Sequence, residues 1–593
     1  MNFKKWISAF LVTCVTVCLI YASYNALVDP FGVFGDKLLD YGEYSMTENP
    51  RVAKIGYLKD NHEKYDSYVI GCSKSSSLPT DSLNRYFDAS FYNMIMYGGD
   101  LYDIEKTAEY IIDNYTAKNI VVVIGLEEAR AFNTEADGMK GNLHARVDGS
   151  PLLPFYYKYL FLNPEYSKNK LEAYFDRGYL ISSKEVFVTE TGTYNKSRRD
   201  AQRIPRLDKY LEENPDFTAK PWYNHIFDAE LCVESLGRIK ALCDSNGTSL
   251  TVIACPVYEK ELLCYNVDEV KAYYKSIAEK VDFWCFSGYT DITREPRYFY
   301  DSMHFRNCVG DMMLAQMFSD ESVFVPEKFG VYVTSDNAEE VINKAFDEKS
   351  DPDLTSPLTV LMYHHFTDAK ALDDQLTALE NAGYTFVTLG DIRAYTVKGT
   401  PLPEKPVLIT VDDGYSSALT VAAPIFERHN ASALVSVIGV SIGRDTYKDT
   451  GIEITEHFAL EDAMEYIDRG VIELISHTWD MHQVEYDGEN YRRGVLPLEN
   501  ESEEDYLNAL RTDFEKSREA LGDITALAYP NGLSTEISEV FLAQSGVDTT
   551  FTTVWGNNEL VKGIPQTTRL LSRITVEENM TGDMLVEYVK NAK

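Results

Sequence analysis

The hydrophobic and polar positions of the chain form one long apolar run followed by two regions of alternating strands and helices. The run from Trp6 to Val28 contains no charged residue, and about 20 such residues cross the hydrocarbon core of a bilayer as a helix. Beyond this run, short β-prone segments alternate with stretches of helical periodicity. The alternation predicts an α/β protein with parallel sheets, preceded by a transmembrane helix over residues 1–28.

The first α/β region extends over residues 29–333. Its predicted strands and helices are Ser67–Gly71, Val121–Gly125, Ser249–Ala254, Leu101–Tyr115 and Val267–Val281. Functional groups in such sheets lie at the carboxyl ends of the strands. Ser73 follows the first strand and is predicted at that edge, although a serine at a strand end is also a common helix cap.

A polar, charged stretch at residues 334–356 predicts a linker to the second region, residues 357–593. This region is organised around Val407–Val411, which runs directly into Asp412, Asp413 and a glycine. Asp-Asp-Gly after a strand is often a plain turn. Because side chains alternate along an extended backbone, one carboxylate can instead bind a cation while the other remains free as a base.

Two histidines downstream favour the cation-binding interpretation. The apolar run Val471–Ile475 leads into a segment that carries His477 and His482. Two ligands on one helix face would be about four residues apart, so this longer spacing indicates a loop. Two imidazoles and a carboxylate form a ligand set suited to a divalent cation. A third strand end, Leu527–Gly532, offers backbone N–H groups near the same rim.

Composition and charge limit the partners. At 593 residues the chain exceeds what one hydrophobic core supports. With 56 basic and 93 acidic residues its net charge is −37, which disfavours nucleic acid as a partner and is compatible with a neutral or cationic polymer. Lys4 and Lys5 before the apolar run predict a cytoplasmic N-terminus and two extracytoplasmic regions. A cleaved signal peptide is the alternative, with Ile20-Tyr-Ala22 as its nearest cleavage site.

Three segments of the second region carry a family resemblance. Thr410–Gly414, His477–His482 and Tyr529–Gly532 resemble the successive motifs of the polysaccharide deacetylase (NodB-homology) family of carbohydrate esterases. The branch that deacetylates poly-N-acetylglucosamine exopolysaccharide is the most similar, because it shares the histidine spacing and opens with Tyr-His, here Tyr363-His364. The resemblance implies a distorted (β/α) barrel that deacetylates an extracellular polysaccharide in partnership with exopolysaccharide synthesis and export machinery.

The same resemblance assigns the metal site and the base. Asp413, His477 and His482 would hold the cation, with zinc as the expected metal, and Asp412 would act as the general base. Arg573 would orient Asp412 or a neighbouring carboxylate, or else form an ordinary salt bridge.

It also assigns substrate contacts and an acid. The backbone N–H of Asn531, which follows Tyr529 and Pro530, would stabilise the oxyanion. No histidine follows His482, so the acid that protonates the leaving amine would be His364, with His365 as an ordinary surface residue beside it.

The first region resembles the SGNH hydrolase superfamily, in particular its membrane-anchored members linked to acylation of cell-surface polymers. Ser73 in Gly-Cys-Ser would be the nucleophile, and Asp301 and His304 would supply the carboxylate and the base. Gly98 matches the block that supplies an oxyanion-hole glycine. The chain departs from the family pattern where Glu127 replaces an asparagine, and where Cys72 precedes the serine.

Three classes of function follow. The leading hypothesis is metal-dependent N-deacetylation of an extracellular amino-sugar polymer, with a second serine-dependent ester site. The alternatives are ester hydrolysis or O-acyl transfer with an accessory deacetylase region, and a polysaccharide-binding scaffold. A complete ligand set with a separate base argues against the scaffold.

Overall fold

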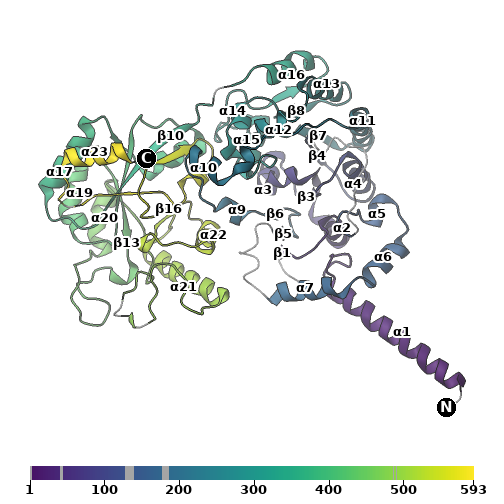
Figure 1. The fold of residues 1–593 in the computed structure, drawn as a ribbon, viewed down its shortest axis with the longest axis horizontal. Helices are drawn as coiled ribbons and strands as arrows, with labels where there is room; N and C mark the ends of the chain where they lie inside the picture. Colours follow the sequence, from purple (N-terminus) through teal and green to yellow (C-terminus); the bar gives the residue numbers. More distant parts are fainter. Residues whose placement is uncertain are drawn as a thin grey trace. The chain divides into compact units, whose positions relative to one another are not determined.

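The protein is described by a computed structural model covering residues 3–39, 44–126, 139–175, 186–350, 352–484, 487–488, 490–577 and 579–592 (Figure 1). It divides into two compact units. The N-terminal unit comprises Met1–Lys196, Asn214–Asp320 and Val325–Pro352, and the C-terminal unit comprises Ser197–Glu213, Glu321–Phe324 and Asp353–Lys593. Two short segments inside the predicted first domain therefore belong to the C-terminal unit.

Helix α1 (Phe3–Val28) matches the predicted apolar run. Its most apolar 18-residue window has a mean hydropathy of 2.0 and none of that window is buried, so the helix is long and apolar enough to cross a membrane or to serve as a signal sequence. Its end is fixed to the N-terminal unit, because the Asn25 amide donates to the carbonyls of Leu160 and Leu162 at 3.0 and 3.2 Å.

The N-terminal unit is built on a six-stranded sheet that is parallel except for its last strand. In pairing order the strands are β3 (Phe91–Ile95), β2 (Ser67–Gly71), β4 (Asn119–Ile124), β7 (Ser249–Ala254), β8 (Phe283–Cys285) and β9 (Val331–Val333). A smaller sheet contains β1 (Tyr44–Ser45), β5 (Val186–Val188) and β6 (Tyr194–Asn195). Helices include α2 (Pro50–Asn61), α3 (Thr80–Phe87), α4 (Leu101–Asn114), α5 (Ala145–Asp148), α6 (Leu152–Leu160), α7 (Pro164–Phe175), α11 (Ala229–Asn246), α12 (Glu259–Leu262), α13 (Val267–Ala278), α14 (Asp291–Arg294), α15 (Asn307–Phe318) and α16 (Ala338–Asp347).

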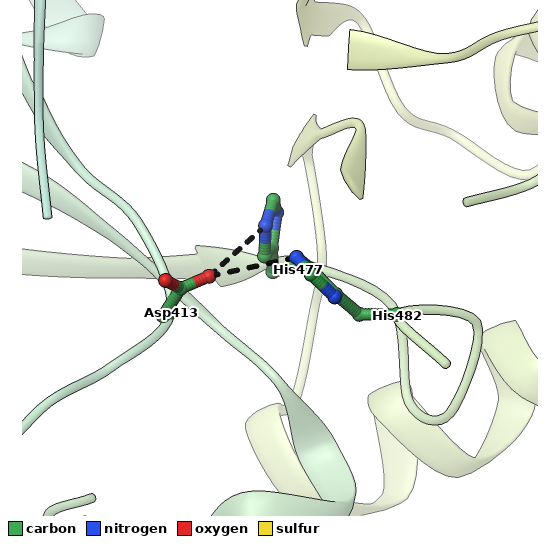
Figure 2. A group of neighbouring side chains, drawn as sticks. All are labelled: Asp413, His477 and His482. Carbon is green, nitrogen blue, oxygen red and sulfur yellow. Dashed lines mark ion pairs between the residues drawn. The ribbon is translucent and has the colours of Figure 1, made fainter. Parts of the chain in front are cut away.

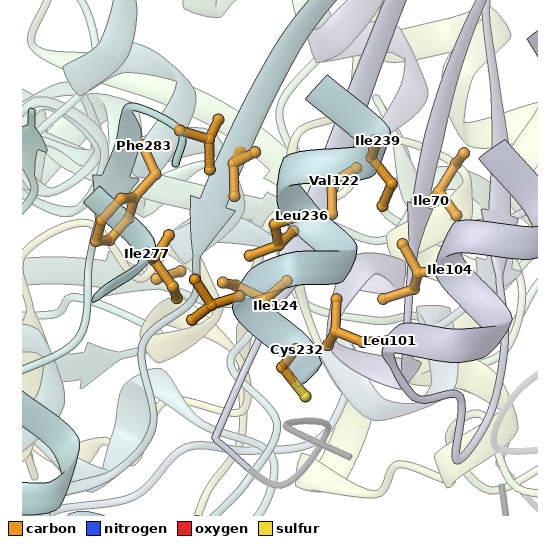
Figure 3. Close-up of a cluster of buried hydrophobic side chains, with 14 of the residues drawn as sticks. Ile70, Leu101, Ile104, Val122, Ile124, Cys232, Leu236, Ile239, Ile277 and Phe283 are labelled. Carbon is orange, nitrogen blue, oxygen red and sulfur yellow. The ribbon is translucent and has the colours of Figure 1, made fainter. Parts of the chain in front are cut away.

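Burial of the sheet explains its composition. All six residues of β4 are buried, as expected for a central parallel strand covered on both faces. Figure 3 shows Leu236 and Ile239 of α11 packed over Val122 of β4, beside Ile104 of α4. This packing holds strands β2 and β8 in place. Ser73 follows the end of β2, and Asp301 and His304 come after β8.

The segment predicted as a linker contains helix α16. Its buried residues Ala338, Ile342 and Phe346 recur at every fourth position and join the core of the N-terminal unit. The many charged residues of this segment occupy the exposed face, which is why composition alone indicated a linker at residues 334–356.

The C-terminal unit is a curled, mostly parallel sheet surrounded by helices. In pairing order its strands are β16 (Thr549–Phe551), β15 (Ala526–Ala528), β14 (Ile472–Ser476), β13 (Ala433–Val437), β12 (Pro406–Val411), β10 (Thr355–Tyr363) and β17 (Asn558–Val561), with β11 (Thr385–Phe386) beside β12 and β18 (Ile574–Thr575) beside β10. Its helices include α9 (Ser197–Asp200), α10 (Leu207–Glu213), α17 (Ala369–Asn381), α18 (Leu389–Lys398), α19 (Ala423–Arg428), α20 (Leu460–Asp468), α21 (Glu503–Leu521), α22 (Glu536–Gln544) and α23 (Gly582–Asn591).

The segment from Leu571 to Thr575 closes this sheet. Leu571 forms a parallel bridge to Phe551, the last residue of β16, at one edge of the sheet. At the other edge, β18 pairs in parallel with β10. The strands therefore return to their starting point, which confirms the predicted distorted (β/α) barrel.

Side chains of β12 alternate between the helices and the barrel interior. Val407, Ile409 and Val411 belong to the cluster under helices α17 and α19, whereas Leu408 belongs to the cluster inside the barrel. The same alternation turns Asp412 inward.

Candidate functional site

The site of the C-terminal unit lies where the parallel strands end. Asp412 and Asp413 follow β12, His477 follows β14, and Asn531 follows β15. Three non-glycine residues at this rim have left-handed backbones, Asp413 (φ 75°), Thr478 (φ 69°) and Asn531 (φ 56°). Such conformations are costly for residues with a side chain and cluster at functional sites.

Asp413, His477 and His482 converge as predicted (Figure 2). The Asp413 Oδ1 atom lies 3.4 Å from His477 Nε2 and 3.9 Å from His482 Nε2, and the three ligand atoms lie within 4.8 Å of one another. His477 Nδ1 lies 2.8 Å from the carbonyl oxygen of Ala528. This oxygen can only accept, so Nδ1 carries a proton, and Nε2 is the ring nitrogen that faces Asp413. The donor set therefore fits a divalent cation.

A half-buried carboxylate of helix α21, Asp513, holds the loop between the two histidines. Asp513 accepts hydrogen bonds from the backbone N–H groups of Trp479 at 2.8 Å and Asp480 at 2.7 Å. Burial raises the pKa of Asp513 to about 6. Gly439 allows the loop to approach closely, because a Cβ there would lie 2.2 Å from the Trp479 ring. Sequence reasoning missed Asp513, which is one of several acidic residues in a helix.

Asp412 is held in a buried network. Its two carboxylate oxygens accept from Arg573 at 2.7 and 2.8 Å, and Ser436 donates to Oδ1 at 2.7 Å. Burial alone raises the pKa of Asp412, but the Arg573 guanidinium and His477 outweigh it and hold the pKa well below its ordinary value. Asp412 is thus ionised at neutral pH. Of the carboxylates that the sequence left open, Arg573 contacts Asp412, in a buried ion pair that is compatible with an orienting role and with an ordinary salt bridge. Ser436 was not predicted.

His364 directly follows β10, which ends beside β12. Tyr363 and Val411 are register partners, and the Asp412 N–H donates to the Tyr363 carbonyl at 2.9 Å. The next residue, His364, is exposed, and its charge contributes to lowering the pKa of Asp412. His365 is half-buried, with its ring 5.7 Å from that of Tyr415.

The Tyr-Pro-Asn segment divides into a buried and an exposed part. Tyr529 and Pro530 are buried, and the Tyr529 hydroxyl donates to Glu539 at 2.5 Å. The Tyr529 side chain therefore supports the turn from within instead of lining the substrate surface. Asn531 is exposed at the rim.

The N-terminal unit brings its predicted residues together at the corresponding edge of its own sheet. Ser73 Oγ lies 2.8 Å from His304 Nε2, and His304 Nδ1 lies 2.8 Å from Asp301 Oδ1. The N–H groups of Met303 and His304 also donate to this Asp301 oxygen, at 3.0 and 2.9 Å, which fixes its position.

The predicted oxyanion-hole glycine lies at the end of the adjacent strand. β3 pairs with β2, and Gly98 lies beyond its end in a left-handed conformation with φ 59°. No atom lies within 4 Å of a Cβ built there, so it borders open space. Cys72 is fully buried beside the serine, and Glu127 lies outside the described residues.

Comparisons with known proteins agree with the C-terminal site. Residues 399–549 match the polysaccharide deacetylase family model. A segment of 117 residues is 36% identical to poly-beta-1,6-N-acetyl-D-glucosamine N-deacetylase of Escherichia coli K12, covering 19% of this chain and 17% of that protein. YxkH of Bacillus subtilis is 24% identical over 244 residues, covering 40% of this chain and 77% of that protein.

Among solved structures, a de-N-acetylase from Aggregatibacter actinomycetemcomitans matches with a TM-score of 0.34 and 20% identity, covering 39% of this chain and 100% of that one. The family match and the ligand set define the C-terminal unit as containing a polysaccharide deacetylase domain. Within that class it is similar to the poly-beta-1,6-N-acetyl-D-glucosamine N-deacetylase, of which the chain spans less than a fifth. The SGNH-like identity of the N-terminal unit stays a prediction.

Proposed function

We propose that the C-terminal unit removes N-acetyl groups from an extracellular amino-sugar polymer of the poly-N-acetylglucosamine type, using a divalent cation, with zinc as the first candidate. The observation that carries this proposal is the Asp413, His477 and His482 set beside a separately held carboxylate, Asp412. A binding module needs no second carboxylate kept ionised by a buried arginine. The similarity to a poly-beta-1,6-N-acetyl-D-glucosamine N-deacetylase supports the choice of polymer.

The proposed roles combine the family resemblance with the contacts around Asp412 and Asp413. A cation bound by the three ligands would lower the pKa of water and polarise the acetyl carbonyl. Asp412 accepts the proton of the attacking water, and the Asn531 N–H donates to the oxyanion. His364 protonates the nitrogen as the carbon–nitrogen bond breaks, which releases acetate and leaves a free amine. Arg573 and Ser436 keep both Asp412 oxygens fixed during proton acceptance.

Two substitutions separate the base from the ligand set. Asp412→Asn should keep the cation and lower turnover at least about 100-fold, the contribution expected of a general base. Asp413→Ala should lose the cation and the activity together. Metal content and acetate release are measured on the same samples, with the highly exposed Asp449→Asn, whose side chain is 96% exposed, as a control. Loss of the cation in Asp412→Asn, or full activity in Asp413→Ala, would show that these roles are misassigned.

We propose as a second function that the N-terminal unit hydrolyses or transfers an O-acyl group. The observation favouring it is the continuous Ser73, His304 and Asp301 hydrogen-bond chain with both links at 2.8 Å. His304 takes the serine proton as the oxygen attacks the acyl carbon, and gives it to the alkoxide that leaves as the ester bond breaks. Water or an acceptor hydroxyl then releases the acyl group from Ser73, while Asp301 keeps the proton on Nδ1 throughout. A fluorophosphonate should label Ser73 and abolish acetyl-ester turnover, as should Ser73→Ala. The exposed Ser90→Ala is the control. Unchanged ester turnover in Ser73→Ala would show that the hydrogen bond between Ser73 and His304 has a structural role only.

A further inference from the structure

A groove with a volume of about 500 Å³ runs between helices α11 and α13 on the N-terminal unit. Its apolar floor includes Ile226 and Val233, and its rim carries four glutamates. These are Glu230, Glu234, Glu269 and Glu279, all exposed, against a single lysine, Lys280. The groove is therefore apolar at its base and negatively charged at its edges.

The segment before α11 carries exposed aromatic side chains, and it adjoins the groove through His225, which lies 3.4 Å from Glu269 and contacts the rings of Tyr223 and Phe227. Trp222, Tyr223 and Phe227 are 58%, 69% and 51% exposed. The segment that carries them is nevertheless fixed to the unit, because Asn224 donates through its backbone to the Cys264 carbonyl and through its side chain to the Tyr265 hydroxyl, both at 2.7 Å. Ordered aromatic rings that face solvent are typical of a recognition surface.

The topology places one end of the groove at the carboxyl edge of the sheet, while Glu279 and Lys280, just beyond the last turn of α13, lie at the other end. Helices α11 and α13 precede β7 and β8, and crossover helices run antiparallel to the strands that follow them. Their first turns, with Glu230 and Glu269, therefore lie at the carboxyl edge. The residues of the serine site follow β2 and β8 at this same edge.

The chemistry of the groove selects its ligand. Carboxylates bind ammonium groups, and the faces of tryptophan and tyrosine attract cations and cover flat apolar surfaces. An amino-sugar polymer freed of N-acetyl groups combines regularly spaced ammonium groups with the apolar faces of its rings. The N-acetylated polymer has no such charge. A basic peptide shares the charge but lacks the repeated ring faces that match Trp222 and Tyr223.

We infer that this groove binds the partly de-N-acetylated polymer and presents it to the Ser73 edge. The inference rests on the proposed function, since the ligand is the product of the proposed deacetylation. Amide deacetylation would then precede the serine-dependent reaction, because the groove favours sugar units that already carry free amines.

The test measures binding to the full-length protein in detergent, in the Asp412→Asn background so that acetylated ligands stay intact. Glucosamine oligomers and N-acetylglucosamine oligomers of equal length are compared by calorimetry at two salt concentrations. We expect the amine form to bind at least tenfold more tightly and to weaken with added salt. Trp222→Ala should weaken it about tenfold, and the Glu234→Gln, Glu269→Gln pair about fivefold. Exposed Glu340→Gln, on the same unit, should have no effect.

Equal binding of the two oligomers, or unchanged binding in the groove variants, would overturn the inference. A polylysine peptide that binds in the groove while the glucosamine oligomer does not would overturn it in favour of a basic protein partner. Because the oligomers are supplied already de-N-acetylated, binding does not depend on catalysis. Failure of acetate release with intact groove binding would count against the proposed function, and the reverse result would count against the groove alone.

Discussion

Arg573 determines the charge balance of the candidate active site. It is fully buried, and its guanidinium binds both oxygens of Asp412 as well as the Thr410 hydroxyl, at 3.1 Å. A buried ion pair gives little net stability, but removal of one partner leaves a charge without compensation. The pair therefore keeps the carboxylate of Asp412 ionised inside the barrel at a cost that the rest of the fold must offset.

Arg573→Met should destabilise the C-terminal unit by about 3–5 kcal/mol, because the Asp412 carboxylate then remains buried without the positive charge of the guanidinium. Hydrogen exchange of the β12 amides measures this. The double variant Arg573→Met, Asp412→Leu should recover most of the loss, since neither charge remains. Equal protection of β12 in the parent and in Arg573→Met would contradict the account.

The predicted ligands and base were visible in the sequence because each sits next to an apolar strand in a short motif. Asp412, Asp413 and His477 follow runs of buried residues, so the pattern itself located them. Ser436 and Asp513 could not be found in this way. Ser436 is a polar residue inside a buried strand, and Asp513 acts on a loop 33 residues away in sequence through backbone contacts.

At the scale of secondary structure, helix α21 holds the loop between His477 and His482. Asp513 projects from its middle and accepts two consecutive N–H groups between His477 and His482. The positions of the two histidine side chains in space are then set by helix α21 as well as by strand β14. Periodicity predicted the strands well, but the charged face of α16 concealed its buried Ala338, Ile342 and Phe346.

Asp513→Asn should weaken cation binding about tenfold, as is typical when an outer partner of a metal site is lost. An amide can accept one of the two N–H groups but turns its own donors toward the other. Competition with a chromophoric chelator gives the affinity, and Glu515→Gln, exposed on the same helix, is the control. An unchanged affinity would mean that the loop is held without Asp513.

His144 makes the stability of the N-terminal unit sensitive to acid. Burial, aided by Arg146, lowers its pKa to about 4, and its Nδ1 accepts the Arg146 N–H at 3.0 Å as the cap of α5. The unfolded residue titrates near 6.5, so unfolding takes up a proton between these values. This stability is present above pH 6.5 and is lost as the pH falls toward 4, by at most about 3 kcal/mol.

His144→Asn keeps a capping acceptor without the titrating ring. The unfolding free energy of this variant should therefore fall less than that of the parent between pH 7 and pH 4.5. Denaturant unfolding followed at both pH values provides the comparison, and parallel losses in the two proteins would exclude this role for His144.

At the scale of the whole molecule, the chain combines an apolar helix with two α/β units. Helix α1 is exposed along its apolar window, and Lys4 and Lys5 precede most of it. We expect the full-length protein in the membrane fraction, with both units digested by protease added to intact cells. Full protection of the chain would contradict this topology, and a soluble form that begins near Ser23 would indicate a cleaved signal sequence.

The two sites should also act independently, since the residues of each belong to one unit. Ser73→Ala should abolish ester turnover and leave amide deacetylation nearly unchanged, because an oxygen ester needs no metal to expel its leaving group. Asp413→Ala should do the reverse. Parallel assays of acetyl-ester cleavage and amide deacetylation on each variant measure this, and a loss of both activities in either variant would show that the sites share a step.

We propose above that Asp413, His477 and His482 make this chain a cation-dependent N-deacetylase. The most direct measurement is mass spectrometry of N-acetylglucosamine oligomers incubated with the purified protein, before chelation, after exhaustive chelation and after a divalent cation is restored. The account predicts stepwise loss of acetyl groups that stops on chelation, returns with the cation and is absent in Asp413→Ala. Deacetylation that persists at full rate after chelation, or in Asp413→Ala, would contradict it.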